Sequence, residues 1–344
     1  MPVFRYALER WEPAPYQVIV FHRGALPAPE QAAVDLLRRA AEPESGAGCI
    51  VLHTIDLDAS PAAAAKSLWD AQPGASAPWM VVRYPPFLEV PDAIWAGPLT
   101  KESVSAALDS PARRRIAKAL LEGQSGLFVL LESGVRDKDD AVAAILDTEL
   151  RRNQEELKLP DLSPGQWDDP AYDENGPPTL RVAFSVIRLA RTDPAEQMFV
   201  KMLLGPGTLP EEAKGPVVFP FVGRGRALCA IPAPDLTADR IEAECEFLVG
   251  PCSCIVKDMN PGLDMLMAVD WDAALAGEPS AIPPVDPPPV TGLAAFAAAR
   301  QAPEPSLSWS ASTLVRRAVA AAIIGFALLM AGIVIWRKRH PRND

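Results

Sequence analysis

The chain has 344 residues, of which 49% are apolar and 22% charged, so it holds enough apolar material for two cores and is not globally disordered. Its net charge is −11, and residues 1–299 are more acidic than the whole chain, because they carry 26 Lys and Arg against 42 Asp and Glu. A body that acidic repels phosphate backbones, and it lacks a basic stripe interleaved with aromatic residues. We therefore expect no nucleic-acid partner.

The first 123 residues predict one α/β unit with the element order β-α-β-α-β-β-α. Its strand segments are rich in β-branched and aromatic residues, and its helix segments repeat apolar residues at helical spacing. The last helix opens at Thr100, and either Thr100 or Ser103 is expected to cap it. The predicted strands are residues 16–23, 49–57, 77–82 and 94–96, and the two earlier helices are residues 29–42 and 62–71.

Residues 124–274 predict a second unit in which this order recurs. The segment 160–178 is rich in Pro, Asp and Gly and indicates an insertion loop, and residues 223–226 indicate a hairpin turn between two strands. The predicted strands are residues 126–133, 180–189, 215–219 and 226–231, and the predicted helices are residues 138–157, 194–204 and 237–249.

This recurring order resembles the thioredoxin fold, over residues 14–250 as two tandem units. Pro78, directly before the third predicted strand, lies where that family has its cis-proline, and Pro216 repeats the pattern of a proline followed by a strand. The resemblance implies an α/β fold in which each unit has a central mixed sheet flanked by helices. A fold alone implies no activity.

A second resemblance rests on two phrases, FRYALERW at residues 4–11 and FLVGPCSCIVKDMNPG at residues 247–262. They are similar to phrases in a family of bacterial membrane or exported proteins that has no established activity. This likeness therefore implies a membrane or envelope location and no particular chemistry.

Thioredoxin-type redox chemistry needs a thiol pair in the loop after the first strand, where the helix N-terminus lowers the thiol pKa. The corresponding loops here are residues 22–27 (HRGALP) and 134–138 (GVRDK), and neither contains cysteine. We therefore predict two redox-silent units without catalytic residues. His22 and Arg23 either present a cation to a ligand or form a solvated strand end.

The remaining candidate for chemistry is the pair Cys252 and Cys254, with Cys245 upstream on the preceding predicted helix. Three interpretations stay open: disulfides that involve Cys245, a redox or metal function, and unpaired buried thiols. The metal that would suit Cys252, Cys254 and Met259 is Cu(I), because thiolates and thioethers are soft ligands, and Met265 and Met267 follow closely. Cys49 and Cys229 lie within apolar strand patterns and are expected in the core.

A membrane anchor is predicted near the C-terminus. Ala318 to Trp336 is uncharged over nineteen residues, enough to approach the roughly 30 Å thickness of the hydrocarbon layer, and basic residues follow it. The prolines within residues 275–315 predict a stiff stalk, and residues 316–344 form the helix and basic tail.

The side of the membrane is open between two arrangements. By the positive-inside rule, the basic residues of the tail predict that the tail lies in the cytoplasm and the body outside it. The first residues, however, show no basic segment followed by an apolar run, which favours a tail-anchored protein with a cytoplasmic body. We predict the first arrangement, a single-pass protein of the inner membrane with an extracytoplasmic body.

Two functions of different classes follow. The first is a membrane-anchored, redox-silent thioredoxin-like module without a cofactor, which binds an envelope protein and acts as an assembly or accessory factor. It rests on the missing loop thiols, the stalk and the acidic surface. The alternative is a thiol-disulfide or copper-handling protein that uses Cys252 and Cys254.

Overall fold

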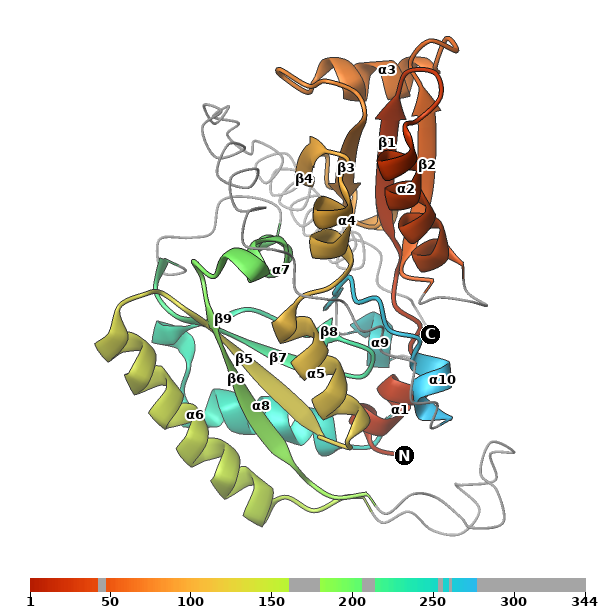
Figure 1. The fold of residues 1–344 in the computed structure, drawn as a ribbon. Coiled ribbons are helices and arrows are strands. Elements are labelled where there is room, and N and C mark those ends of the chain that lie inside the picture. The colour runs from red at the N-terminus through yellow and green to blue at the C-terminus, as the bar shows by residue number, and fades with distance from the viewer. Residues whose placement is uncertain (43–47, 161–179, 206–213, 253–255, 260–261, 277–344) are drawn as a thin grey trace, which may run out of the picture. The chain divides into compact units, whose positions relative to one another are not determined.

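The computed structural model describes residues 1–42, 48–160, 180–205, 214–252, 256–259 and 262–276. Within these ranges the chain has a mixed α/β fold with two β-sheets flanked by helices, as the sequence predicts (Figure 1). None of the described helices is long and apolar enough to span a bilayer. The predicted membrane helix, Ala318 to Trp336, lies outside the described residues, as does the predicted stalk from residue 277 onward.

The first sheet has four strands in the order β2-β1-β3-β4. β1 and β2 are parallel, in unbroken register from Tyr16 opposite Ile50 to His22 opposite Asp56. β3 is antiparallel to β1, and β4 is antiparallel to β3, so β2 and β4 form the two edges. The strands are β1 (Tyr16–His22), β2 (Ile50–Asp56), β3 (Trp79–Arg83) and β4 (Ala93–Pro98).

The two faces of the first sheet are covered unequally, because successive side chains of a strand point to opposite faces. Val18 and Val20 of β1 pack in the core that α2 and α4 complete. Phe21 points to the other face, where its ring lies 5.4 Å from that of Trp69 on α3, a helix with no fully buried residue. The helices are α2 (Ala28–Ala41), α3 (Ala63–Asp70) and α4 (Lys101–Leu108).

A capping box sets the start of α4. The Thr100 side chain accepts a hydrogen bond from the Ser103 N–H at 3.1 Å, and the Ser103 hydroxyl accepts one from the Thr100 N–H at 3.0 Å. Each side chain thereby satisfies a backbone donor that the helix leaves unpaired. Of the two predicted caps, Thr100 is the N-cap residue and Ser103 is its partner.

The two prolines singled out in the sequence differ in backbone geometry. The Ala77–Pro78 peptide bond, directly before β3, is cis, and it is the one cis bond within the described ranges. The bond before Pro216 is therefore trans. The Pro216 carbonyl accepts a hydrogen bond from the Ala233 N–H at 3.0 Å, which ties the start of the following strand to a later loop.

The second sheet has the strand order β10-β8-β7-β5-β6, with β9 also paired to β7. Its pairing repeats that of the first sheet, since β5 is parallel to β6 and antiparallel to β7. The strands are β5 (Gly126–Glu132), β6 (Phe184–Ala190), β7 (Val217–Val222), β8 (Arg226–Ala227), β9 (Ile231–Pro232) and β10 (Leu263–Asp264).

The hairpin turn predicted at residues 223–226 is confirmed, because β7 and β8 pair antiparallel with Val222 opposite Arg226. Gly223 and Gly225 have φ values of +61° and +85°, which glycine adopts without strain. The single strand predicted over residues 226–231 is wrong: two short strands, β8 and β9, stand there instead. Between them the Leu228 N–H donates to the Pro220 carbonyl at 2.9 Å.

Helices cover both faces of the second sheet. On one face α5 (Pro111–Leu121) and α7 (Gln197–Leu204) pack against alternate residues of β5, and on the other lie α6 (Arg136–Glu156), α8 (Ala238–Val249) and α1 (Val3–Arg10). The sequence analysis did not predict α1 or α5. Two short helices, α9 (Val256–Met259) and α10 (Trp271–Leu275), come near the end of the described chain.

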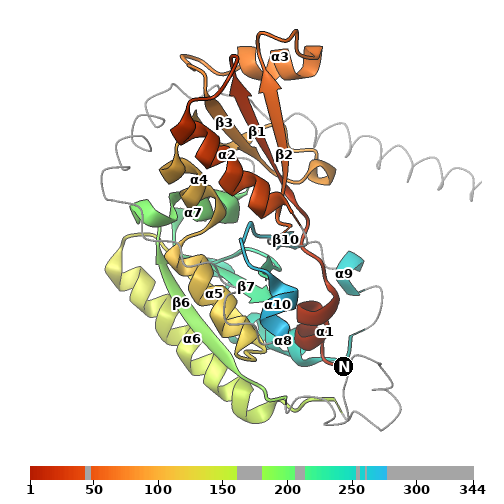
Figure 2. The ribbon, with the colours of Figure 1, turned by 45° about the vertical axis from the view of Figure 1, so that its right-hand side comes forward.

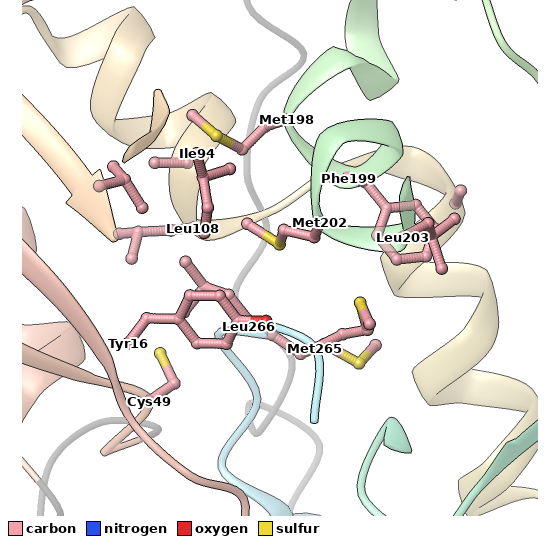
Figure 3. Close-up of a cluster of buried hydrophobic side chains, with 14 of the residues drawn as sticks. Tyr16, Cys49, Ile94, Leu108, Met198, Phe199, Met202, Leu203, Met265 and Leu266 are labelled. Atoms are coloured by element: carbon pink, nitrogen blue, oxygen red, sulfur yellow. The ribbon is translucent and has the colours of Figure 1, made fainter. Parts of the chain in front are cut away.

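The two sheets share one apolar core. Tyr16 and Leu108 from the first 123 residues pack in the same buried cluster as Met198, Met202 and Leu266 from the later residues (Figure 3). The Tyr84 hydroxyl adds a direct link, since it donates to the Lys201 carbonyl at 3.1 Å. The predicted boundary at residues 123 and 124 therefore separates the sheets in sequence, while their packing is continuous.

Candidate functional site

The loop after β1, where a thioredoxin-type enzyme would have its thiols, is closed by polar contacts. Asp56 Oδ1, at the end of β2, accepts hydrogen bonds from the Gly24 N–H at 3.2 Å and the Asp58 N–H at 3.0 Å. These bonds, with the nearby His22 and Arg23, lower the pKa of Asp56. The loop thus forms a solvated end of the parallel strands, with the Gly24 N–H bonded to a carboxylate of the neighbouring strand.

Arg23 and His22 are likewise engaged within this loop. The Arg23 guanidinium lies 2.6 Å from Asp58, and His22 Nδ1 lies 2.8 Å from the Gly24 carbonyl oxygen. Both partners of the ion pair are more than half exposed, so the pair contributes little to stability. Of the two interpretations of His22 and Arg23, this arrangement favours the solvated strand end.

The equivalent loop after β5 is closed in the same way by one buried carboxylate. Asp139, which is 3% exposed, accepts hydrogen bonds from the Ser133 N–H at 2.8 Å, the Ser133 hydroxyl at 2.9 Å and the Gly134 N–H at 3.0 Å. An acidic group in the first turn of α6 is also favoured by the helix dipole. Each βα loop therefore donates at least one backbone N–H to a carboxylate, and neither loop carries a thiol.

Cys245 and Cys252 lie in the same apolar cluster, on the α6 and α8 face of the second sheet. Cys245 is fully buried on α8 as a free thiol, and burial raises its pKa well above the usual value. Cys252 is half-buried, and its N–H donates to the Met1 carbonyl at 2.9 Å. Cys254 lies outside the described residues, and so does the side chain of Met259.

The methionines after the cysteine pair lie elsewhere. Met265 and Met267 are 2% and 3% exposed and belong to the core shared by the two sheets, in which Figure 3 shows Met265. Cys245 and Cys252 belong to a different cluster. The two methionines therefore pack as core residues, away from Cys252. Within the described ranges no group of three or more His, Cys, Asp or Glu side chains is placed to hold a metal ion.

The other two thiols are also protected. Cys49 is buried, as predicted, and burial raises its pKa to about 12. Cys229 was expected inside a core strand, but it is half-buried in the loop between β8 and β9 and accepts a hydrogen bond from Arg240 at 3.4 Å. Burial, with the nearby Glu244, still raises its pKa to about 11. At neutral pH these thiols are protonated and poor nucleophiles.

The two phrases that carry the second resemblance meet in space. Apolar side chains of the first phrase pack in the same buried cluster as those at the end of α8. The two residues that flank the first phrase bond to the second: the Val3 N–H donates to the Gly250 carbonyl at 2.9 Å, and the Lys257 ammonium donates to the Glu12 carbonyl at 2.8 Å. The first phrase forms α1, and the second spans the end of α8 and α9 (Figure 2). Their contact could not be predicted from the sequence, because nothing local indicates that residues about 240 apart lie together.

The β7–β8 turn holds this assembly together. Arg224, which is 8% exposed, donates from Nε to the Leu8 carbonyl at 2.8 Å and from Nη2 to the Glu9 carbonyl at 3.0 Å and to Asp272 at 2.6 Å. Leu8 and Glu9 are in the last turn of α1, whose carbonyls lack partners within the helix. A turn that the sequence indicated only as a hairpin thus joins both ends of the described chain.

Comparison with protein-family models, with curated proteins and with solved structures finds no match for this chain.

Proposed function

We propose that this chain is a membrane-anchored protein-binding module, made of two redox-silent thioredoxin-like units, that serves as an assembly or accessory factor of the bacterial envelope. The observation that carries the proposal is the state of the two βα loops. Each is closed onto a carboxylate, Asp56 or Asp139, where the thioredoxin-type reaction would need a thiol. The pairing of each sheet supports the fold: a first strand parallel to the second and antiparallel to the third.

The loop between β3 and β4 offers a binding anchor. Phe87, in the 3₁₀ turn η1 (Pro86–Leu88), is 67% exposed, the largest fraction for any large apolar side chain within the described ranges. The backbone of this loop is restrained, because Arg83 Nη2 donates to the Pro91 carbonyl at 3.1 Å and two prolines restrict the backbone before Phe87. A restrained backbone lowers the entropy that the loop loses on binding, and an exposed aromatic side chain suits a contact with an apolar pocket of a partner.

A photocrosslinker tests this role in the native membrane. We expect p-benzoylphenylalanine in place of Phe87 to yield a discrete adduct with an envelope protein. The matched control replaces Ile145, an apolar residue of α6 that is 42% exposed, and should yield none. A chain that gives no adduct at position 87, or the same adducts at both positions, would contradict the proposal.

The alternative function is tested with the full chain purified in mild detergent. We expect insulin reduction and Cu(I) binding at background level, unchanged by Cys252→Ser and Cys254→Ser, because the described thiols with raised pKa values are protected and Met265 and Met267 lie in another cluster. Binding of about one Cu(I) per chain that is lost on either substitution would instead establish a copper-handling protein that uses soft thiolate ligands.

The proposed topology is a single membrane helix, Ala318 to Trp336, with the body outside the cytoplasm and the basic tail inside. It is supported by the charge bias around that segment. A reporter that is active only in the cytoplasm, fused after Asp344, should therefore be active. An inactive cytoplasmic reporter together with an active periplasmic one would reverse the orientation.

A further inference from the structure

The outer edge of β2 is one of the two edges of the first sheet. Among the described strands β2 pairs with β1 alone, and Figure 1 shows it at the margin of the sheet. Val51 is 42% exposed, and His53 and Thr54 are exposed as well. The strand keeps regular register with β1 over its whole length, so the backbone groups of alternate residues point away from β1. Of these groups, the Asp56 carbonyl also accepts a hydrogen bond from the Ala59 N–H at 3.2 Å.

β2 lacks the features with which proteins block an open edge, namely proline, bulges, inward charges and very short length. It reads IVLHTID, with its one acidic residue, Asp56, at the end. The other described edges are blocked: β4 ends in Pro98 and is paired across a register shift, β10 has two residues, and β6 carries Arg188. The open edge is therefore specific to β2.

Two hydrogen bonds determine which backbone groups of β2 point outward. The Cys49 carbonyl accepts from the Tyr16 N–H at 3.0 Å, and the Leu57 N–H donates to the His22 carbonyl at 2.8 Å, so both residues face β1. Backbone direction alternates along a strand paired on one side, so Val51, His53 and Ile55 also face β1. The outward donors and acceptors therefore belong to Ile50, Leu52, Thr54 and Asp56.

We propose that β2 binds β2 of a second copy of this chain as an antiparallel pair, with the two-fold axis at His53. In this register Leu52 lies opposite Thr54 of the second copy, and Ile50 lies opposite its Asp56. Every outward residue then meets an outward residue, which is the condition for a hydrogen-bonded antiparallel pair. The two four-stranded sheets join into one continuous sheet across the dimer.

The side chains of β2 are self-complementary in this register, which identifies a second copy as the occupant. Val51 lies opposite Ile55 of the second copy, an apolar pair between β-branched residues. The two Asp56 carboxylates lie at opposite ends of the paired strands and are not opposed, and the residue that lies opposite its own copy is His53. With the axis at Leu52, Asp56 has no opposite residue within β2 of the second copy. With the axis at Thr54, Ile50 has none, and in both cases hydrogen bonds are lost at one end.

A charge placed on the edge tests the pairing. The full chain in mild detergent should contain two chains per particle by light scattering, and Val51→Lys should contain one, because an edge lysine prevents strand addition. The matched control is Ile145→Lys, since Ile145 on α6 has the same exposed fraction of 42% and should keep two chains. Equal thermal unfolding temperatures of the variants show that both fold. A single chain per particle in the unsubstituted protein, or a Val51→Lys dimer, would overturn the proposal.

Disulfide trapping tests the register independently. A residue on the two-fold axis lies opposite its own copy, within the roughly 5.5 Å between Cα atoms that a disulfide spans. We expect mild oxidation to cross-link His53→Cys into a dimer and leave Leu52→Cys uncross-linked, with the unsubstituted chain as the reference for its native thiols. Cross-linking of both variants to the same extent, or of Leu52→Cys alone, would refute the two-fold at His53. The dimer is independent of the envelope partner, so its failure leaves the proposed function standing.

Discussion

At the scale of single residues, burial decides the chemistry of the ionisable groups. Glu196 is 2% exposed, and its Oε1 accepts a hydrogen bond from the Ala112 N–H at 2.6 Å, at the start of α5. Burial raises its pKa, while Ser110, Ala112 and Arg113 act in the opposite direction. A carboxylate that caps a helix from a distant segment therefore carries a desolvation cost whenever it is ionised.

This raised pKa predicts a pH dependence with a defined sign. The folded state binds the Glu196 proton more tightly than the unfolded state, so this group's contribution is complete below its unfolded pKa and is lost as pH rises through its folded pKa. Glu196→Gln keeps an acceptor for the Ala112 N–H and removes the charge. At neutral pH we expect the variant to be at least as stable as the unsubstituted chain.

Urea unfolding of both chains between pH 4 and pH 8 measures the effect. The stability advantage of Glu196→Gln should shrink as pH falls, whereas Glu155→Gln, at an exposed position of α6, should follow the unsubstituted chain throughout. An advantage that grows toward low pH would show that the assigned direction of the pKa shift is wrong.

At the scale of elements, the docking of α1 depends on the β7–β8 turn. A Cβ atom on Gly223 would lie 2.8 Å from the Cβ of Ala7 and 3.0 Å from its carbonyl carbon, so the turn and the helix backbone approach as closely as glycine permits. The same turn presents Arg224 to the last carbonyls of α1. The helix is thus fixed by its fit to a turn of distant sequence.

We therefore expect Gly223→Ala to destabilise the chain by about 2–3 kcal/mol, about 1 from the positive φ and the remainder from the clash with Ala7. Gly134→Ala is the matched control, because Gly134 has φ +87° with no atom within 4 Å of an added Cβ. It should lose about 1 kcal/mol, the cost of backbone strain alone. Equal losses in denaturant unfolding would mean that the contact with α1 contributes nothing.

At the scale of the whole molecule, buried polar groups join the two halves in addition to the shared core. Arg113 on α5 is 1% exposed and donates to the Ala106 carbonyl at 2.7 Å and, from Nη1, to the Ala107 and Leu266 carbonyls, both at 2.8 Å. The first two acceptors are in the last turn of α4, where a cation also suits the helix dipole. One side chain thus connects the first sheet's helix α4, α5 and the segment that follows β10.

Arg113→Met should lower the free energy of unfolding by about 3 kcal/mol, because it leaves buried carbonyls without donors. Arg113→Lys should recover little, since a lysine cannot reproduce the planar fork of donors. Arg115→Met, at an exposed position of the same helix, should change stability by less than about 0.5 kcal/mol. A small effect of Arg113→Met, measured by denaturant unfolding, would show that the link is dispensable.

The candidate site was only partly predictable. The absence of thiols from both βα loops and the buried position of Cys49 follow from strand patterns that the structure bears out. The sequence also predicts that Cys252 and the later methionines lie close together, and the structure places Met265 and Met267 elsewhere. The chain after α8 crosses to the opposite face of the second sheet, where these two methionines enter the shared core. Residues that are close in sequence are therefore far apart here, because the chain passes from one face of the sheet to the other between them.

Elements whose signals are local can be predicted from the sequence. They are the strands β1, β2, β3 and β5, the periodic helices between them, a helix cap at Thr100 or Ser103, and the glycines of the β7–β8 turn. Tertiary structure alone decided that α1 packs on the second sheet, that the two sheets share a core, and that Arg113 and Arg224 are buried. The physical reason is that a local signal depends on a few neighbouring residues, whereas burial of an arginine depends on carbonyls supplied from far along the chain.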